Sequence, residues 1–399
     1  MPQDSVETTD LSFDDLDLSP DIRNAIREVG FEHPTPIQAQ AIPYALDDYD
    51  VIGLAETGSG KTAAFVIPMA ETLREGRGIR GLILCPTREI ALQTKAFIDA
   101  LGAKQELSSV CIIGGVRMGP QITDLRRKPD IVVATPGRLF DHMGRGNISL
   151  KDIEMLVLDE ADHMLDLGFL PQILKILEEI PEDRHTMMFS ATMPPPIERL
   201  AQRFLFEPEL VDIRPKGRTA EGIEHRIYLV ATKDKMKALQ ALLNEEKGST
   251  LIFIRRKVDA EWASRRLERD GFQVQRIHSN LSQGQRVAAL KGLREGQHRI
   301  LVATDIAARG IDIPVIEHII NFTLPETVQD YVHRAGRTAR GNASGIVSTI
   351  GTWQDKMMVR EIERAIGQTL VRHEVEGVES YQERRKTIKG RERVRRRLL

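Results

Sequence analysis

Short, continuous apolar runs recur along the chain, and each leads through small or charged residues into a segment with a helical pattern. Continuous runs are expected where both faces of a strand are buried. Strands that alternate with helices form right-handed βαβ units, and hence a parallel sheet that binds ligands at the carboxyl ends of its strands. The runs are Val51–Ala55, Gly81–Cys85, Ile131–Ala134, Met155–Leu158, Thr186–Phe189, Thr250–Ile254, Val274–Ile277, Ile300–Ala303 and His318–Phe322. The predicted fold class is therefore α/β.

The predicted strands form two groups, separated by the segment Arg214–Gly222. This segment is polar, contains proline and glycine, and has no apolar periodicity, which is typical of a linker. We therefore predict an α/β domain over residues 1–213, a linker over 214–222, a second α/β domain over 223–372 and a tail over 373–399. The two halves have the same general organisation, without a simple sequence repeat.

Charge is unevenly distributed along the chain. The segment Tyr381–Leu399 holds nine Lys or Arg and two Glu, which leaves −9 on the other 380 residues because the whole chain carries −2. A basic tail on an acidic body indicates a polyanionic partner, but a solvated, charged helix end accounts for the composition equally well.

Other features of the composition exclude several classes of protein. There is no run of 18 or more apolar residues, and the polar, acidic N-terminus does not resemble a secretory signal. The ten histidines lack the spacing of metal ligands, so we expect no structural zinc. The two cysteines, Cys85 and Cys111, are expected to be buried, reduced thiols in a cytoplasmic protein.

A glycine-rich segment, AETGSGKT, follows the first apolar run and precedes a helical pattern, which is the setting of a P-loop. Glycines let backbone N–H groups approach phosphate oxygens, and the next helix presents its positive N-terminus to them. Lys61 is expected to reach the β- and γ-phosphates of a nucleotide, and Thr62 to place its hydroxyl on Mg²⁺. The predicted nucleotide-binding residues are Ala55, Glu56, Thr57, Gly58, Ser59, Gly60, Lys61 and Thr62. The usual pattern begins with glycine, and Ala55 holds that position here.

An acidic tetrapeptide, Asp159-Glu160-Ala161-Asp162, follows the apolar run Met155–Leu158. A carboxylate at the end of a buried strand is costly unless a cation accompanies it. Asp159 is therefore expected to hold the Mg²⁺ of ATP, and Glu160 to orient the attacking water. An acidic helix N-terminus would give a similar pattern, but the upstream P-loop favours the nucleotide site.

DEAD at 159–162 together with AETGSGKT resembles the DEAD-box RNA helicases of superfamily 2, and the resemblance extends over residues 13–341. It implies two tandem RecA-like domains, ATP and Mg²⁺ as cofactors, and RNA as a partner that is contacted mainly through its backbone. The segment GFEHPTPIQ is similar to the family's Q motif, and Phe13 lies 17 positions before it. By that resemblance Phe13 stacks on adenine and Gln38 hydrogen-bonds to its edge.

The remaining motifs are assigned by the same resemblance. In the first half, PTREIALQ, a Gly-Gly pair and TPGR imply RNA contacts by Pro86, Thr87, Arg88, Gly115, Thr135, Pro136 and Arg138. Ser190 and Thr192, in a Ser-Ala-Thr triplet, imply coupling of hydrolysis to strand separation. In the second half, the implied RNA contacts are Gln283, Arg286, Thr304 and Asp305, while Asp312 contacts the ATP ribose. The segment HRAGRTAR supplies Arg337 and Arg340 as arginine fingers and His333 as an interdomain sensor.

Some positions depart from the family pattern. Ala335 and Ala339 replace the usual Ile and Gly, and Arg256 stands where a Thr usually meets RNA. Alanine lacks the conformational freedom of glycine, so the geometry of the fingers is open at Ala339. The role of Arg256 is open too, although arginine can contact phosphate.

The combined motifs predict RNA-stimulated hydrolysis of ATP to ADP and phosphate, used to unwind or remodel short RNA duplexes and RNA–protein complexes. The catalytic groups are divided between the two domains, so ATP and RNA are expected to favour a closed state. Two alternatives remain open: an ATP-gated RNA clamp with slow turnover, which the same residues would serve, and a DNA translocase with the same two-domain plan.

Overall fold

The computed structural model describes residues 8–56, 58–73, 76, 78–102, 107–214, 222–305, 316–338 and 344–378, apart from the side chain of Gln283. Most of the predicted linker and the basic segment Tyr381–Leu399 therefore lie outside the described residues. The chain forms two compact units, Met1–Arg214 and Pro215–Leu399. Within the described ranges, no helix combines the length and the apolar character needed to cross a membrane.

Unit 1 is built on a seven-stranded parallel sheet with the order β3-β4-β2-β5-β6-β1-β7. Its strands are β1 (Val51–Leu54), β2 (Gly81–Leu84), β3 (Ser109–Ile112), β4 (Ile131–Ala134), β5 (Met155–Leu158), β6 (His185–Ser190) and β7 (Glu209–Asp212). The ends of β5, β6 and β1 lie next to one another, which brings the P-loop, the acidic tetrapeptide and the Ser-Ala-Thr triplet to one edge.

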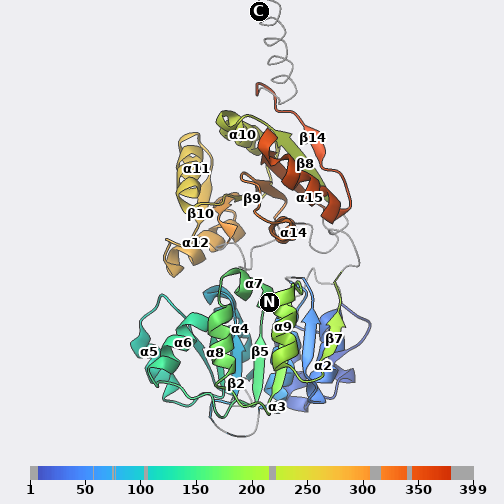
Figure 1. Ribbon diagram of the computed structural model, residues 1–399, viewed down its shortest axis with the longest axis vertical. Helices are drawn as coiled ribbons and strands as arrows, with labels where there is room; N and C mark the ends of the chain where they lie inside the picture. Colours follow the sequence, from blue (N-terminus) through green and yellow to red (C-terminus); the bar gives the residue numbers. More distant parts are fainter. Residues whose placement is uncertain are drawn as a thin grey trace, which may run out of the picture. The chain divides into compact units, whose positions relative to one another are not determined.

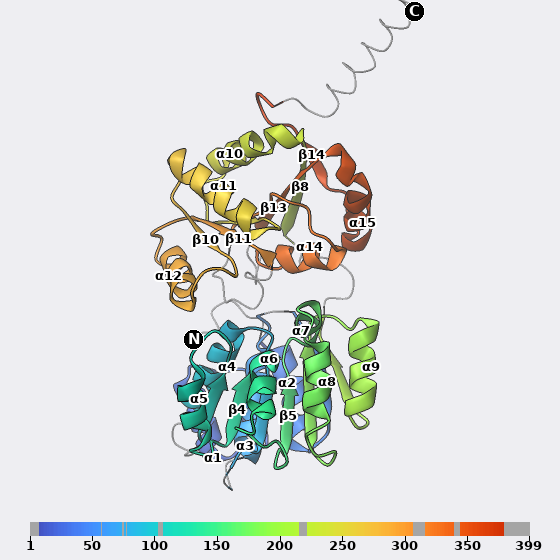
Figure 2. The same cartoon turned by 60° about the vertical axis from the view of Figure 1, so that its left-hand side comes forward.

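Helices cover both faces of this sheet (Figures 1 and 2). Residues alternate between the two cores, so that Ile83 of β2 joins one core while Leu82 and Leu84 join the other. The first core is closed by η1 (Phe13–Asp15), α1 (Pro20–Glu28), α2 (Pro36–Leu46), α3 (Lys61–Thr72) and α4 (Arg88–Gly102). The second is closed by α5 (Met118–Leu125), α6 (Pro136–Gly144), α7 (Ala161–Asp166), α8 (Leu170–Leu177) and α9 (Pro195–Phe204).

Unit 2 repeats this plan with a parallel sheet of the order β10-β11-β9-β12-β13-β8-β14. Its strands are β8 (Ile223–Leu229), β9 (Thr250–Phe253), β10 (Val274–Ile277), β11 (Ile300–Ala303), β12 (His318–Asn321), β13 (Gly345–Gly351) and β14 (Val371–His373). One face packs against α10 (Lys235–Glu245) and α11 (Lys257–Arg269). The other packs against α12 (Gln283–Arg294), α14 (Val328–Ala335) and α15 (Lys356–Ile366).

All nine predicted strands are present, and the α/β fold with two RecA-like parallel sheets is confirmed. Sequence patterning missed β3, β7, β8, β13 and β14. Strands β3, β7 and β14 are short and partly exposed at or near the edges of the sheets, so they lack a continuous apolar run. Strands β8 and β13 are largely buried, but polar side chains interrupt their apolar pattern.

Candidate active site

The glycine-rich loop connects β1 directly to α3, as its sequence predicts. Gly60 is the N-cap of α3 and adopts φ 92°, a conformation that favours glycine. A Cβ atom at Gly60 would overlap the amide nitrogen of Gln38. Gly58 also has a positive φ, of 91°. The loop therefore exposes backbone N–H groups at a helix N-terminus, which is a suitable environment for an anion. Thr57 lies outside the described residues.

Lys61 is the first residue of α3, and its side chain turns back into the loop. The side chain is buried, and Nζ donates hydrogen bonds to the carbonyl oxygens of Ala55 at 2.6 Å and Glu56 at 3.1 Å. The loop is closed further by Ser59, whose hydroxyl donates to the Glu56 carbonyl at 2.9 Å. The half-buried Thr62 is next in the helix. A cationic amine is thus held at the loop by groups that a phosphate oxygen could replace.

Gln38 joins α2 to the P-loop through both ends of its amide. Its Oε1 accepts from the backbone N–H of Thr35 at 3.0 Å, and its Nε2 donates to the carbonyl of Gly60 at 3.0 Å. Phe13 is buried in the first core, and its ring stacks on Phe31 with centroids 6.4 Å apart. Both side chains lie near the nucleotide loop or in its supporting core, but their predicted adenine contacts stay predictions.

Asp159 follows β5 and is 3 % exposed. Burial, with a further contribution from the charge of Glu160, raises its pKa to about 7, while Lys61 acts in the opposite direction. Glu160 has φ 49° and ψ 56°, a left-handed conformation that is uncommon for a residue with a side chain. Its Oε2 lies 3.0 Å from Nδ1 of His163. The two carboxylates predicted to be catalytic are therefore both shielded from solvent.

Asp162 connects the acidic tetrapeptide to the Ser-Ala-Thr triplet. Its Oδ2 accepts from the Thr192 backbone N–H at 2.9 Å and from the Thr192 hydroxyl at 2.7 Å. Its own backbone N–H donates to the hydroxyl of Ser190 at 3.2 Å. Sequence reasoning named Ser190 and Thr192 but missed Asp162 and His163 as partners in the site. Because β5 and β6 are neighbours in the sheet, Asp162 lies beside Ser190 and Thr192.

The residues at this edge fit a Mg²⁺ ion that arrives with a nucleotide. Asp159 is a buried carboxylate whose pKa is raised by burial, and a divalent cation beside it would stabilise its charged form. The Asp159 carboxylate and the Thr62 hydroxyl are hard oxygen donors, which Mg²⁺ prefers. Among the described residues, no three His, Cys, Asp or Glu side chains converge on a metal site. Mg²⁺ that is bound with a nucleotide takes most of its ligands from phosphates and water.

A second group of predicted residues lies at the ends of β2, β3 and β4. Arg88 begins α4, and its guanidinium lies so close to Gly115 that a Cβ atom there would overlap it. Arg138 donates from Nη1 to the carbonyl of Val116 at 3.1 Å. Pro86, Thr87, Thr135 and Pro136 are buried beside these arginines in the chain. Three of the motifs are thus connected by direct contacts in an arrangement of N–H groups and cations that suits phosphates.

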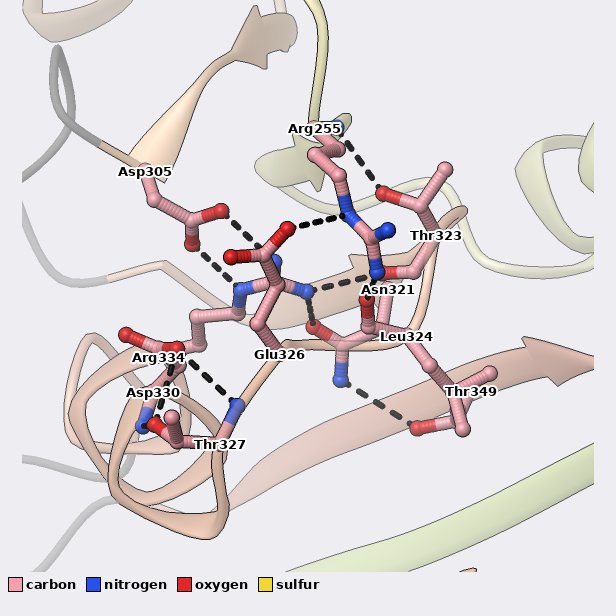
Figure 3. Close-up of polar contacts among 10 residues, drawn as sticks. All are labelled: Arg255, Asp305, Asn321, Thr323, Leu324, Glu326, Thr327, Asp330, Arg334 and Thr349. Carbon is pink, nitrogen blue, oxygen red and sulfur yellow. Dashed lines mark hydrogen bonds and ion pairs between the residues drawn. The ribbon is translucent and has the colours of Figure 1, made fainter. Parts of the chain in front are cut away.

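Arg334 is the centre of a polar network in unit 2 (Figure 3). It is 3 % exposed, and its Nε and Nη2 donate to the two carboxylate oxygens of Asp305 at 2.6 and 2.7 Å. Its Nη1 donates to Asn321 Oδ1 at 2.8 Å and to the Thr323 carbonyl at 2.9 Å. The guanidinium also lies 4.9 Å from the centre of the Phe253 ring. Sequence reasoning missed Arg334, although it lies inside the HRAGRTAR segment.

The loop after β12 is held from a second side by Arg255. The backbone N–H of Arg255 donates to the Thr323 hydroxyl at 2.9 Å, Nη2 donates to the Leu324 carbonyl at 3.2 Å, and Nε pairs with Glu326 at 3.2 Å (Figure 3). This loop leads into α14, which ends at Ala335. The residue after β9 is thus tied to the loop that leads into α14.

Other predicted residues of unit 2 are only partly described. Thr304 and Arg337 are buried, His333 is half-buried on α14 with Nε2 3.4 Å from Gln329 Nε2, and Arg286 is half-buried on α12. Arg256 pairs with Asp259 at 2.7 Å. Asp312, Ala339 and Arg340 lie outside the described residues, as does the side chain of Gln283.

The chain is similar in sequence to one family of proteins. The family described as DEAD/DEAH box helicase matches residues 35–200, and the family described as helicase conserved C-terminal domain matches residues 234–342. The DEAD-box ATP-dependent RNA helicase CshA of Bacillus subtilis is 41% identical over 356 residues, which is 89% of this chain and 72% of CshA. The ATP-dependent rRNA helicase RRP3 of Debaryomyces hansenii is 44% identical over 362 residues, which is 90% of this chain and 76% of RRP3.

Solved structures show the same likeness. The structure of S. cerevisiae Dbp5 bound to RNA and ADP BeF3 is 28% identical and has a TM-score of 0.81. The similarity covers 95% of this chain and 99% of the Dbp5 chain.

Proposed function

The chain belongs to the DEAD-box ATP-dependent RNA helicases, and from this premise we propose which of its residues carry out the RNA-stimulated hydrolysis of ATP. RNA is its partner and ATP its energy source. The observation that carries the residue assignment is the continuous arrangement at the ends of β1, β5 and β6. There the P-loop with Lys61, the carboxylates Asp159 and Glu160, and the Asp162–Thr192 contact lie on adjacent strands.

The P-loop binds the phosphates of ATP. Backbone N–H groups between Gly58 and Lys61 donate to phosphate oxygens, and the N-terminus of α3 adds its positive end. Lys61 exchanges its hydrogen bonds with the Ala55 and Glu56 carbonyls for bonds to the β- and γ-phosphates. Support for this step comes from the positive φ angles of the two glycines, which aim the loop inward.

Asp159 and Thr62 would hold Mg²⁺, which compensates phosphate charge when it is bound. Glu160 orients the hydrolytic water through its carboxylate. Thr192 and Ser190, through Asp162, connect this edge to the loop after β6, so a change at the phosphates alters the hydrogen bonds of that loop. RNA backbone contacts are assigned to the Arg88–Gly115–Arg138 group and to the residues around Thr304.

Catalytic groups are divided between the units in this proposal, because Arg337 and Arg340 belong to unit 2. An arginine finger is typically worth about 10³–10⁵ in rate. Such a large contribution would make hydrolysis depend on both units, and therefore on RNA. The cytoplasm is the proposed location, supported by Cys85 and Cys111, which are both free thiols.

The decisive experiment is steady-state ATP turnover without nucleic acid, with single-stranded RNA, and with DNA of the same sequence. We expect strong stimulation by RNA and little by DNA, because the 2′-OH distinguishes the two polymers. Equal stimulation by DNA would support the alternative that the chain is a DNA translocase. Tight ATP-dependent RNA binding with little turnover in every sample would support the clamp instead.

The residue assignment is tested separately with Glu160→Gln. Turnover should fall by about 10²–10⁴-fold, the usual range for loss of general acid–base catalysis, while binding of RNA and of a non-hydrolysable ATP analogue persists. Near-normal turnover would remove Glu160 from the proposed role and leave the family membership untouched.

A further inference from the structure

His163 contacts the carboxylate of Glu160, which is proposed to orient the hydrolytic water. His163 is not part of any motif used above. Its ring is 4 % exposed, and its Nδ1 lies 3.0 Å from Oε2 of Glu160, whose side chain is 13% exposed. Since a carboxylate oxygen only accepts, Nδ1 of His163 must carry the hydrogen in this contact. The other ring nitrogen, Nε2, is buried without a hydrogen-bond partner among the described residues. Glu160 is therefore the polar group that this buried ring serves.

The local backbone explains why Glu160 needs such a partner. Glu160 is the N-cap residue of α7, but its side chain makes no capping hydrogen bond with that helix. Its φ of 49° is a conformation that residues with side chains adopt only when the surroundings fix it. His163 lies three residues later, on the same side of the first helical turn. The His163 contact thus holds a carboxylate that does not cap α7.

His163 is also placed accurately by the rest of the site. Its backbone N–H donates to Oδ1 of Asp162 at 2.9 Å, and Oδ2 of the same carboxylate accepts from Thr192. A chain of contacts therefore runs from the loop after β6 through Asp162 to the backbone of His163, whose ring contacts Glu160. The backbone of His163 is held by Asp162, and its buried ring makes its described polar contact with Glu160.

We propose that His163 is a positioning residue that holds the Glu160 carboxylate in the orientation needed to align the hydrolytic water. This inference rests on the proposed role of Glu160. It predicts a kinetic role for His163 in the hydrolytic step and none in the affinity for ATP or RNA, because the residue is buried and is not expected to touch either ligand.

The test compares two substitutions in the full chain. His163→Leu keeps a side chain of similar bulk but removes the donor, whereas His163→Asn places an amide N–H where Nδ1 was. At saturating ATP and RNA, we expect kcat of His163→Leu to fall roughly tenfold, because misplacing a catalytic group by about 1 Å can cost about 10²-fold. KM for ATP and the Kd for RNA should stay within about twofold of wild type, and His163→Asn should recover most of kcat.

A matched control is His142→Leu. His142 is also fully buried in unit 1, on α6, and its Nδ1 contacts Asn147 at 3.3 Å, away from the catalytic carboxylates. It should retain wild-type kcat per folded molecule, with folding checked by urea denaturation of every variant. If His163→Leu has a wild-type kcat, or if folded His163→Asn is as slow as His163→Leu, the proposal is overturned.

A double substitution separates this inference from the proposed function. In the Glu160→Gln background, measured by single turnover, His163→Leu should cause little further loss, since both changes act on the same step. A full tenfold further loss in this background would mean that His163 does not act through Glu160. That result would overturn the inference about His163 and leave the proposed role of Glu160 in place. Near-normal turnover of Glu160→Gln by itself would overturn the role of Glu160 and this inference together.

Discussion

At the residue scale, the P-loop lysine shows how the chain's own carbonyl groups can accept hydrogen bonds from a buried cation when no ligand is bound. Lys61 is buried, and burying an ammonium without partners would be costly, but the Ala55 and Glu56 carbonyls accept its hydrogen bonds. The same geometry keeps the charge at the loop, near Asp159. Phosphate oxygens would therefore exchange one set of acceptors for a charged set, which makes stronger hydrogen bonds.

Lys61→Ala should abolish ATP turnover while leaving the fold intact. The substitution removes the only P-loop side-chain cation in the proposed phosphate contact, and Ala is the best helix former for the first turn of α3. Turnover with saturating RNA measures the effect, and Lys151→Ala, an exposed lysine in unit 1, is the control. Near-normal turnover of Lys61→Ala would contradict the P-loop assignment.

Sequence reasoning predicts loop geometry where a motif is local, and misses contacts that join separate strands or lie outside the motifs. Gly58, Gly60 and Lys61 can be predicted because loop geometry and phosphate chemistry demand those residue types. Asp162 was missed because its partner Thr192 becomes meaningful only after β5 and β6 are placed side by side. His163 was missed for another reason: it contacts Glu160 three residues away, and no motif includes it. The structure also shows that Gln38 bonds to Gly60, a contact that no local pattern predicts.

At the element scale, buried polar pairs explain why some strands escaped prediction. His225 in β8 lies 2.7 Å from the Tyr331 hydroxyl, and His318 in β12 lies 2.8 Å from the Ser348 hydroxyl. Each histidine is at most 3 % exposed. Pairing removes most of the cost of burying these groups, so a central strand can carry polar residues without an apolar run. Patterning found β12 from Ile319 and Ile320 but missed β8 and β13.

These histidines should make unit 2 sensitive to acid. Burial lowers the pKa of both His225 and His318 to about 4, with Arg226 and Arg299 adding to the effect at His318. The unfolded chain takes up protons near pH 6.5 and the folded chain does not, so stability is retained above that pH and lost as the pH falls towards 4. At pH 5 the loss should be about 2 kcal/mol for each histidine.

Urea denaturation at pH 7.5 and pH 5.0 measures this effect. The variant with both His225→Gln and His318→Gln should be less stable at pH 7.5 but should show a smaller drop between the two pH values. An equal drop in the variant and the wild type would assign the acid sensitivity to other groups.

The Arg334 network should be the most sensitive polar feature of unit 2. Removing one partner of a buried pair typically costs about 3–5 kcal/mol, because the other charge stays buried. Arg334→Lys keeps the charge but cannot form the two parallel bonds to Asp305 or the bonds to Asn321 and Thr323. We expect a loss of several kcal/mol in the free energy of unfolding, measured by urea denaturation. Arg256→Lys, at an exposed pair, should leave the free energy of unfolding close to that of wild type. An equal loss in both variants would refute the importance of the network.

At the scale of the whole molecule, the two units share one topology. Each sheet has the same order when its strands are numbered from its own first strand, so β8 corresponds to β1, β9 to β2, and β12 to β5. The sequence indicated only a common general organisation, because the apolar runs that define the strands carry no information on their order. The correspondence shows which positions of unit 2 are equivalent to the site residues of unit 1.

The basic segment Tyr381–Leu399 belongs to this scale as a predicted RNA anchor that does not depend on sequence. Each phosphate contact adds about 0.9 to the slope of log K against log salt on a duplex, or about 0.7 on a single strand. Deleting the segment should flatten that slope, measured by RNA binding at several salt concentrations. A variant with its Lys and Arg replaced by Gln should match the deletion, and an unchanged slope would favour the solvated-helix alternative.

The shared topology also predicts that the chain binds one nucleotide. Lys235 begins α10 after β8, as Lys61 begins α3 after β1. The preceding residues, Val230–Asp234, contain no glycine, so they lack the loop conformation that exposes N–H groups to phosphate. Lys235 donates instead to the carbonyl of Phe322 at 2.9 Å, and burial lowers its pKa. Phe322 follows β12, at the position that corresponds to Asp159 after β5, so an aromatic ring replaces the carboxylate that is proposed to hold Mg²⁺.

Calorimetric titration with ADP or a non-hydrolysable ATP analogue should therefore give one site per chain. Lys61→Ala should weaken that binding strongly. Lys235→Ala should leave the stoichiometry and affinity near wild type while lowering the stability of unit 2, because it removes a buried hydrogen bond and a cation 5.7 Å from the Phe322 ring centre. Two sites per chain, or loss of nucleotide binding in folded Lys235→Ala, would mean that the equivalent position in unit 2 has kept a phosphate-binding role that its residues do not support.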